Sequence, residues 1–314
     1  MPKQTGKKRT TGRSQPYSST KSRRSTQKTV QQNAALASKI AALKANDKYE
    51  VSEAFLRECG DAFKEVRGFA VDGMVSACSG LGVTREGLHV AVRLFDYCAL
   101  NVWEERENRN DLMRHNLVAV GYACVSIASK FVDKKPVKAA DLAGLINQSP
   151  LRDGTYSVAH ILKLETHILT TVSMDLPDTT VCAFADRFAT AGGIATNSRE
   201  HAFVHFVLEL ALTDYTFCKY KASLMAAAAV YMTRKTFLTG AGMPREGENS
   251  WPDTLAAVTG IEKKKNWLFF ECAQRMADVL RSFCRPERAV GKHDALAAKW
   301  KQPGFFSLGA FLYD

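Results

Sequence analysis

The chain has 314 residues, of which 43 are Lys or Arg and 32 are Asp or Glu, so its formal charge is +11. The excess lies in residues 1–48, which hold 12 basic side chains and a single acid, Asp47, whereas the other 266 residues hold 31 of each sign. A neutral body argues against a folded domain that binds nucleic acid. The longest uncharged run, residues 116–129, is 14 residues long. It is too short to span a bilayer as a helix, so we expect no membrane partner.

The N-terminal segment 1–48 is predicted to be a disordered basic tail. Residues 1–30 contain 11 Ser/Thr, nine Lys/Arg and almost no apolar side chains, too few to offset the entropy of ordering. Two basic clusters in it have the spacing of a bipartite nuclear-import signal, although basic clusters also occur in tails that only confer solubility. We therefore expect localisation to nucleus and cytoplasm. The residues of the candidate import signal are Lys7, Lys8, Arg9, Lys21, Arg23 and Arg24.

The sequence after Tyr49 predicts an all-α fold. Apolar residues recur every three or four positions, and the alternation typical of strands is scarce. The predicted helices of the first half span 50–58, 61–79, 84–101, 111–132, 138–146 and 156–172. Those of the second half span 178–190, 198–215, 220–238, 251–259 and 262–284. Pro177 separates the two sets, because proline interrupts a helix.

The two halves repeat one pattern. Each has a central helix, at 117–130 and at 222–234, that is apolar on all sides and rich in small residues. Such a helix must be surrounded by other helices. An amphipathic helix ending in Asp-Tyr precedes each of them. The repetition predicts two tandem five-helix units. The predicted domains are 49–176 and 177–288, with a C-terminal extension at 289–314 that packs on the body.

The sequence contains no pattern typical of catalysis or of metal binding. It has no Gly-rich phosphate loop, no HExxH and no Ser nucleophile elbow. The eight cysteines form no CxxC pair and lie mostly among apolar neighbours, as buried thiols in a reducing compartment do. The seven histidines are scattered. The lack of such patterns fits a binding module rather than an enzyme, and we expect no cofactor and no metal.

Several segments, taken in order, resemble the cyclins of the A/B (mitotic) type. In the first half these are VRGFAVD at 66–72, TREGLHVAVRLFD at 84–96, IASKF at 127–131, ILKLE at 161–165 and MDLP at 174–177. In the second half they are DYTFCKYKASLMAAA at 214–228 and the pairs Trp251-Pro252 and Thr259-Gly260. The resemblance implies two cyclin boxes and a regulatory subunit that activates a cyclin-dependent protein kinase in cell-cycle control, forming a heterodimer with it.

The resemblance also implies roles for individual residues. Lys130 and Glu165 match the cyclin residues that grip the small-lobe helix of the kinase. Without the resemblance, Lys130 reads as a cation at a helix C-terminus and Glu165 as a solvated acid. Arg67 and Asp96 match an internal salt bridge between the first two helices of the box. The residues that match further kinase-packing positions are Ile127, Phe131, Asp133, Leu169 and Leu176.

Two further sites are expected from the pattern. A/B-type cyclins dock substrates and inhibitors bearing Arg-x-Leu on an apolar patch of the first helix, which here corresponds to Val66, Phe69, Ala70 and Gly73. Ala70 and Gly73 replace larger side chains, so the pocket should be shallower. Ser149 begins a Ser-Pro-x-Arg pattern that such kinases favour, so it is a candidate phosphorylation site, and an ordinary turn is the alternative.

Other interpretations remain open at this point. One is a transcription-type cyclin, and another is a cyclin-fold transcription factor or scaffold that activates no cell-cycle kinase. A transcription factor with cyclin-like repeats would carry an N-terminal zinc ribbon and basic repeats. This chain has no CxxC pair and its body is neutral.

Overall fold

The computed structural model describes residue 57 and residues 61–104, 117–149, 154–176, 180–240, 250–262, 265–285 and 293–305. Within these ranges the regular structure is helical, without a strand, as predicted. The predicted tail 1–48 and the import signal lie outside the described residues. The helices of the first half are α3 (Asp61–Leu81), α4 (Arg85–Glu104), α6 (Leu117–Val132), α7 (Ala139–Gln148) and α8 (Val158–Thr171). Those of the second half are α9 (Val181–Ala191), α10 (Arg199–Leu212), α11 (Ala222–Gly240), α12 (Asp253–Thr259) and α13 (Trp267–Phe283).

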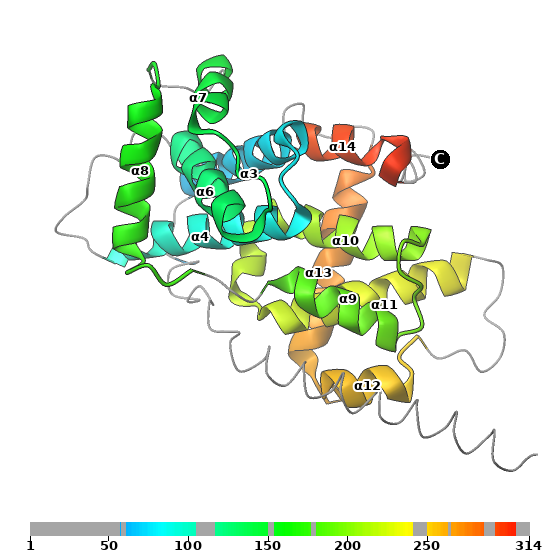
Figure 1. Cartoon of the computed structure of the whole chain (residues 1–314). Coiled ribbons are helices and arrows are strands. Elements are labelled where there is room, and N and C mark those ends of the chain that lie inside the picture. The colour runs from blue at the N-terminus through cyan, green and yellow to red at the C-terminus, as the bar shows by residue number, and fades with distance from the viewer. Residues whose placement is uncertain are drawn as a thin grey trace, which may run out of the picture. The chain divides into compact units, whose positions relative to one another are not determined.

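Helix α6 is the central helix of the first half, where α3, α4, α7 and α8 pack around it (Figure 1). Every residue from Val118 to Ser129 is buried. Small side chains allow this enclosure: a Cβ added at Gly121 would lie only 3.0 Å from Met74 Sδ on α3. The prediction of a buried central helix is confirmed, and the reason is that a helix without a polar face must be covered on all sides.

Helix α11 has the same position in the second half. It packs against α9, α10 and α13, and residues 226–230, which are four alanines and a valine, are fully buried. The two halves therefore share one arrangement, in which neighbouring helices enclose a central helix of small apolar residues: four helices around α6 and three against α11.

The start of α4 is fixed by a contact with the end of α6. Thr84 caps α4, because its Oγ1 accepts a hydrogen bond from Gly87 N at 3.1 Å. The Thr84 hydroxyl in turn donates to Asp133 Oδ1, just after α6. Gly87 is required here, since a Cβ would lie 2.7 Å from Val83 Cγ1. A capping glutamate would not fit at position 87, and the carboxylate of Asp133 takes its place.

Some predicted boundaries differ from the structure. The helix expected at 198–215 ends at Leu212, and a 3₁₀ helix follows at η1 (Tyr215–Lys219). The reason is local: Asp214 Oδ1 accepts from Thr216 N, so the side chain competes with the helical hydrogen bonds. The helix expected at 251–259 begins at Asp253, and Pro252 occupies its N-cap without a side-chain hydrogen bond.

A buried arginine joins the two halves. Arg67 on α3 donates from Nε and Nη2 to both carboxylate oxygens of Asp96 on α4, at 2.7 and 2.8 Å. Its Nη1 donates to the carbonyl oxygen of Leu212 at 2.9 Å. The pair assigned to the first two helices from the sequence therefore also binds the end of α10, so one side chain ties three helices together.

The C-terminal segment returns to the first helix. There α14 (Asp294–Trp300) packs on α3, followed by η2 (Pro303–Phe305). Asp72 on α3 accepts hydrogen bonds from the backbone N–H groups of Ala295 and Leu296, at 3.0 and 3.3 Å. A carboxylate at this position satisfies free N–H groups at the start of the helix and complements its dipole.

A buried ion pair completes this contact. Glu209 on α10 accepts from Lys299 Nζ at 2.8 and 2.9 Å and from Trp300 Nε1 at 2.8 Å. Arg85 Nε on α4 lies 3.5 Å from Glu209 Oε1. The buried carboxylate thus has partners from α4 and α14, and it anchors the C-terminal helix between the two halves.

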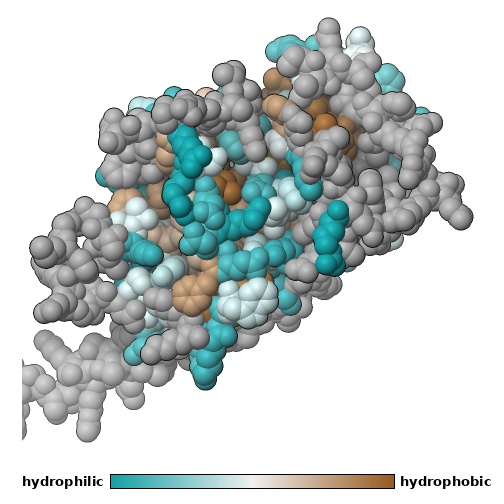
Figure 2. Space-filling view, turned by 180° about the vertical axis from the view of Figure 1, so that it is seen from behind, coloured by the Kyte–Doolittle hydropathy of each residue, from teal (hydrophilic) through white to brown (hydrophobic). Residues whose placement is uncertain are grey.

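The seven described cysteines are all free, and five of them are buried. Within the described ranges, no helix is both long enough and apolar enough to cross a bilayer. On the face seen in Figure 2, hydrophilic side chains lie across the middle, and apolar side chains gather in smaller areas between them.

Candidate partner-binding site

The charged pair expected from the sequence is formed. Lys130 lies in the last turn of α6, and Glu165 lies in the middle of α8, which packs beside α6 (Figure 1). Lys130 Nζ donates to both carboxylate oxygens of Glu165, at 2.6 and 2.8 Å. The pair is therefore held by the packing of two helices, with each side chain restricted by its own helix.

The two members of the pair differ in exposure. The side chain of Lys130 is 43% exposed, whereas that of Glu165 is only 10% exposed. Glu165 is thus the buried member of the pair, and Lys130 is the member that faces solvent. Because Lys130 still has contact with water, the ammonium group can turn toward a partner molecule while the carboxylate stays in place.

Apolar side chains stand exposed on the same two helices. Phe131 follows Lys130 and is 48% exposed, and Leu162, one turn before Glu165, is 45% exposed. Val158 is 41% exposed and lies one turn further back on α8. Leu162 and Val158 were missed by the sequence prediction. Their i, i+4 spacing on the face of Glu165 was a readable signal.

The turn after α8 adds another exposed apolar residue. Ser173 and Met174 both have left-handed backbone angles, with φ of 51° and 59°. Met174 is 69% exposed. Left-handed non-glycine residues are uncommon and occur where surrounding structure imposes them. We call Val158, Leu162, Phe131 and Met174, together with Lys130 and Glu165, the α6–α8 face.

The other residues predicted to pack on a partner divide into three groups. Leu169 and Leu176 are half-buried near the C-terminal end of α8 and after it, so each keeps some exposed surface. Ile127 is only 4% exposed. The prediction that it contacts a partner is therefore corrected to a core position, because α6 is enclosed at that level. Asp133 is half-buried and binds Thr84, so its main contact is internal.

The predicted first-helix patch is only partly exposed. Val66 is exposed, Phe69 and Gly73 are half-buried, and Ala70 is fully buried. A Cβ added at Gly73 would lie 3.5 Å from the ring of Tyr122. Ala70 therefore lies in the core and cannot line a docking pocket, and Tyr122 occupies the space beside Gly73. A shallower docking patch at these residues stays a prediction.

The candidate phosphorylation site lies at the end of a helix. Ser149 is the C-cap of α7, and its backbone N–H bonds to the carbonyl oxygen of Ile146. The remainder of the Ser-Pro-x-Arg pattern, residues 150–152, lies outside the described residues. Phosphorylation of Ser149 stays a prediction.

A second polar cluster lies in the second half. Asp186 on α9 and His201 and His205 on α10 form the group whose side chains could hold a metal ion among the described residues. Burial would raise the pKa of Asp186, but hydrogen bonds and charge from His205 and His201 outweigh it and lower that pKa. Burial lowers the pKa of His205 and keeps its imidazole neutral. A carboxylate beside two imidazoles is a set of groups that could ligate a metal ion, and the expectation that the chain needs no metal stays a prediction.

Comparison with known proteins agrees with the geometry. Residues 39–177 match the family model "Cyclin, N-terminal domain", and residues 179–311 match "Cyclin, C-terminal domain". The chain is 25% identical over 248 residues to the G2/mitotic-specific cyclin C13-1 of Daucus carota, covering 78% of this chain and 64% of the relative. It is 27% identical over 207 residues to cyclin-A2 of Gallus gallus, covering 66% and 46%.

A further curated relative and a solved structure are also cyclins. The G2/mitotic-specific cyclin-B3 of Gallus gallus is 23% identical over 256 residues, covering 81% of this chain and 55% of the relative. A solved viral cyclin from herpesvirus saimiri shares the fold with a TM-score of 0.58 and 16% identity, covering 76% of this chain and 95% of that one. The matched region spans about half to two thirds of the curated relatives' length.

Two cyclin domains in tandem therefore cover the body of the protein. The chain belongs to the cyclin family, and its relatives place it with the A/B type.

Proposed function

We propose that the chain is the regulatory subunit of a cyclin-dependent serine/threonine protein kinase and that it binds the kinase through the α6–α8 face. The observation that carries the proposal is the Lys130–Glu165 pair, at 2.6 and 2.8 Å, beside exposed apolar side chains. Exposed apolar groups next to one charged pair are what a specific interface needs. The apolar area gives affinity, and the charges fix the register.

The proposed mechanism is a shift of the kinase population. The α6–α8 face binds the kinase state in which the small-lobe helix is turned inward, so that the catalytic Lys–Glu pair of the kinase assembles. Lys130 and Glu165 hold the small-lobe helix and the backbone leading into it. Under this proposal the chain contributes binding energy and no catalytic group of its own.

Two further parts of the proposal concern substrate and location. The first-helix patch around Val66 and Phe69 offers a small apolar surface for substrates or inhibitors, which is less deep than an Arg-x-Leu pocket needs because Ala70 is buried. The basic clusters at 7–9 and 21–24 would direct import, giving a protein of nucleus and cytoplasm.

A transcription-type cyclin or a scaffold is the less favoured alternative, since the relatives found are mitotic cyclins.

The test is reconstitution with purified kinases. The full chain is mixed with each member of a panel of cyclin-dependent kinases, and complexes are separated by gel filtration. Phosphorylation of histone and of polymerase repeats is then measured. We expect a 1:1 complex and an increase in histone phosphorylation with at least one cell-cycle kinase. If the chain binds no kinase in the panel, the scaffold alternative holds. Selective phosphorylation of polymerase repeats would favour the transcription-type alternative.

Two variants test, in the same assay, whether the complex forms through the α6–α8 face. Leu162→Asp places a charge in the exposed apolar area, and Val66→Asp places one on the first helix at a similar exposure. We expect Leu162→Asp to abolish the complex, because burying an unpaired carboxylate is costly, and Val66→Asp to leave it intact. Equal behaviour of the two variants would contradict the location of the interface.

A further inference from the structure

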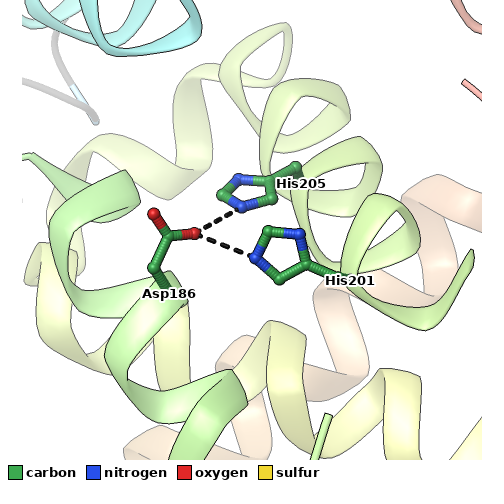
Figure 3. A group of neighbouring side chains, drawn as sticks. All are labelled: Asp186, His201 and His205. Atoms are coloured by element: carbon green, nitrogen blue, oxygen red, sulfur yellow. Dashed lines mark hydrogen bonds and ion pairs between the residues drawn. The ribbon is translucent and has the colours of Figure 1, made fainter. Parts of the chain in front are cut away.

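Three side chains far from the α6–α8 face converge on one point. His205 Nε2 lies 2.8 Å and His201 Nε2 lies 3.1 Å from the same oxygen, Oδ1 of Asp186 (Figure 3). The histidines are four residues apart on α10, so they lie on one face of that helix, and Asp186 comes from the adjacent helix α9. All three ligand atoms lie within 4.8 Å of one another.

This geometry is close to that of a zinc site. Zinc bonds to imidazole nitrogen and carboxylate oxygen are about 2.0–2.2 Å long, and a tetrahedral site with such bonds separates neighbouring ligand atoms by about 3.4 Å. The two distances to Asp186 must therefore open by a few tenths of an ångström. Asp186 can move, because its side chain is 61% exposed, whereas the His205 side chain is fixed at 1% exposure. One anchored ligand and one movable ligand allow an ion to enter from solvent.

One buried nitrogen of the cluster has no hydrogen-bond partner among the described residues. His205 Nε2 is bonded to Asp186, but His205 Nδ1 is buried and has no hydrogen-bond partner among the described residues. A buried ring nitrogen without a partner is rare, and because Nδ1 lies on the side of the ring away from Asp186, an ion held by Nε2 would not be that partner. The charges near the cluster include Arg85, which opposes a cation, and Glu86, whose carboxylate interacts with Asp186 and favours one.

We propose that Asp186, His201 and His205 bind a divalent transition-metal ion, with Zn²⁺ as the ion of choice, and that this ion ties α9 to α10. Two imidazoles and one carboxylate suit borderline metals such as zinc. The exposed side of the cluster leaves the fourth position to water. The site is separate from the α6–α8 face, and the proposal does not depend on kinase binding.

The experiment uses the full chain without a histidine tag, stripped of metal by a chelator. Zn²⁺ is titrated in competition with a chromogenic chelator. Co²⁺ is added in parallel, because its visible absorption reports tetrahedral nitrogen and oxygen ligands. We expect one equivalent of Zn²⁺ to bind. Asp186→Ala and His201→Ala should each weaken binding by about a hundredfold or more, since even loss of an outer-shell partner typically costs about 10–100-fold. The matched control His167→Ala, on α8, should bind as the unchanged protein does.

A second measurement distinguishes Zn²⁺ binding at this site from Zn²⁺ binding at the cysteines. Zn²⁺ should raise the thermal unfolding midpoint of the unchanged chain and of His167→Ala, because an ion that binds only the folded state stabilises it. It should not raise that of Asp186→Ala. The substitutions avoid buried His205, so the variants should remain folded, which circular dichroism checks. Absence of binding, or equal affinity in all variants, would overturn the proposal; a thiolate absorption band with Co²⁺ would do so too.

Discussion

Lys130 Nζ lies 2.6 and 2.8 Å from the two carboxylate oxygens of Glu165, although the residues are 35 positions apart in the chain. Lys130 lies in the last turn of α6, a helix that α3, α4, α7 and α8 surround, and Glu165 is buried in the helix beside it. The packing of α6 against α8 thus places a positive charge at the surface directly over a buried negative one. That placement suits a surface that must present apolar groups and still select one partner.

Replacing the buried arginine should strongly destabilise the fold. In Arg67→Ala, the carboxylate of Asp96 and the carbonyl oxygen of Leu212 lose their donors. Breaking a buried pair from one side typically costs about 3–5 kcal/mol, and we expect a loss of that size in the free energy of unfolding, measured with urea. The control is Arg281→Ala, which breaks an exposed pair with Asp278 and should cost at most about 1 kcal/mol. Similar losses in both variants would contradict the role of Arg67.

The buried pair of Glu209 and Lys299, which anchors α14, should stabilise the fold only while both charges are present. Lys299→Met leaves the fully buried Glu209 short of its closest cation, and we expect a loss of about 3–5 kcal/mol in urea unfolding. In Glu209→Gln/Lys299→Met the charge is gone and the amide oxygen can still accept from Trp300 Nε1. The double variant should therefore be more stable than Lys299→Met alone. A double variant that is less stable than the single one would show that the charge pair is not what holds α14.

Asp133 should contribute to stability through the cap of α4. Asp133→Ala removes the acceptor of the Thr84 hydroxyl, and we expect a loss of about 1–2 kcal/mol, as for removal of a helix cap. Adding Thr84→Ala to Asp133→Ala should cost less than Thr84→Ala alone, because both substitutions remove one shared interaction. Additive losses in the urea double-mutant cycle would assign Asp133 to a different contact.

The buried thiols should make the protein less stable at high pH. Burial raises the pKa of Cys78 from 9.0 to about 12. In the unfolded chain the thiol loses its proton from about pH 9 upward, whereas in the folded chain it keeps it up to about pH 12. The contribution of this thiol to stability is thus complete below about pH 9 and is lost as the pH rises toward about 12.

Unfolding by urea at a series of alkaline pH values measures this effect. The decline should be shallower in Cys78→Ala than in the unchanged chain. Near neutral pH, the pKa of about 12 instead of 9.0 also lowers the thiolate fraction of Cys78 about a thousandfold. Alkylation of Cys78 in the folded protein should therefore be slow by a similar factor. Alkylation as fast as in the denatured chain would show that Cys78 is not buried.

The fold could be predicted from the sequence because the pattern of apolar residues that indicates a helix is local. Periodic apolar residues predict helices, and two all-apolar helices such as α6 and α11 predict two enclosed centres. Periodicity says less about side chains on an enclosed helix, where every face looks alike. The resemblance to cyclins assigned Ile127 to a partner surface and Ala70 to a docking patch, and both side chains are buried in the structure.

Contacts between distant segments had no comparable signal. Glu209 and Lys299 are 90 positions apart, and no spacing rule connects them. A glutamate inside an apolar helix such as α10 did indicate a buried charge that needs a partner. The histidines at 201 and 205 had helical i, i+4 spacing, but their third partner, Asp186, becomes evident only when α9 packs on α10.

The most direct test of the account measures kinase affinity across the Lys130–Glu165 pair. The dissociation constant of the reconstituted complex is determined for the unchanged chain, Lys130→Ala, Glu165→Ala, the double variant and the surface control Arg281→Ala. Folding is verified by circular dichroism. Loss of one partner of a charge pair that becomes buried on binding typically costs about 2–5 kcal/mol, and we expect both single variants to weaken binding about thirtyfold or more. The control should bind normally. A double variant that binds and activates the kinase as the unchanged chain does would contradict the account.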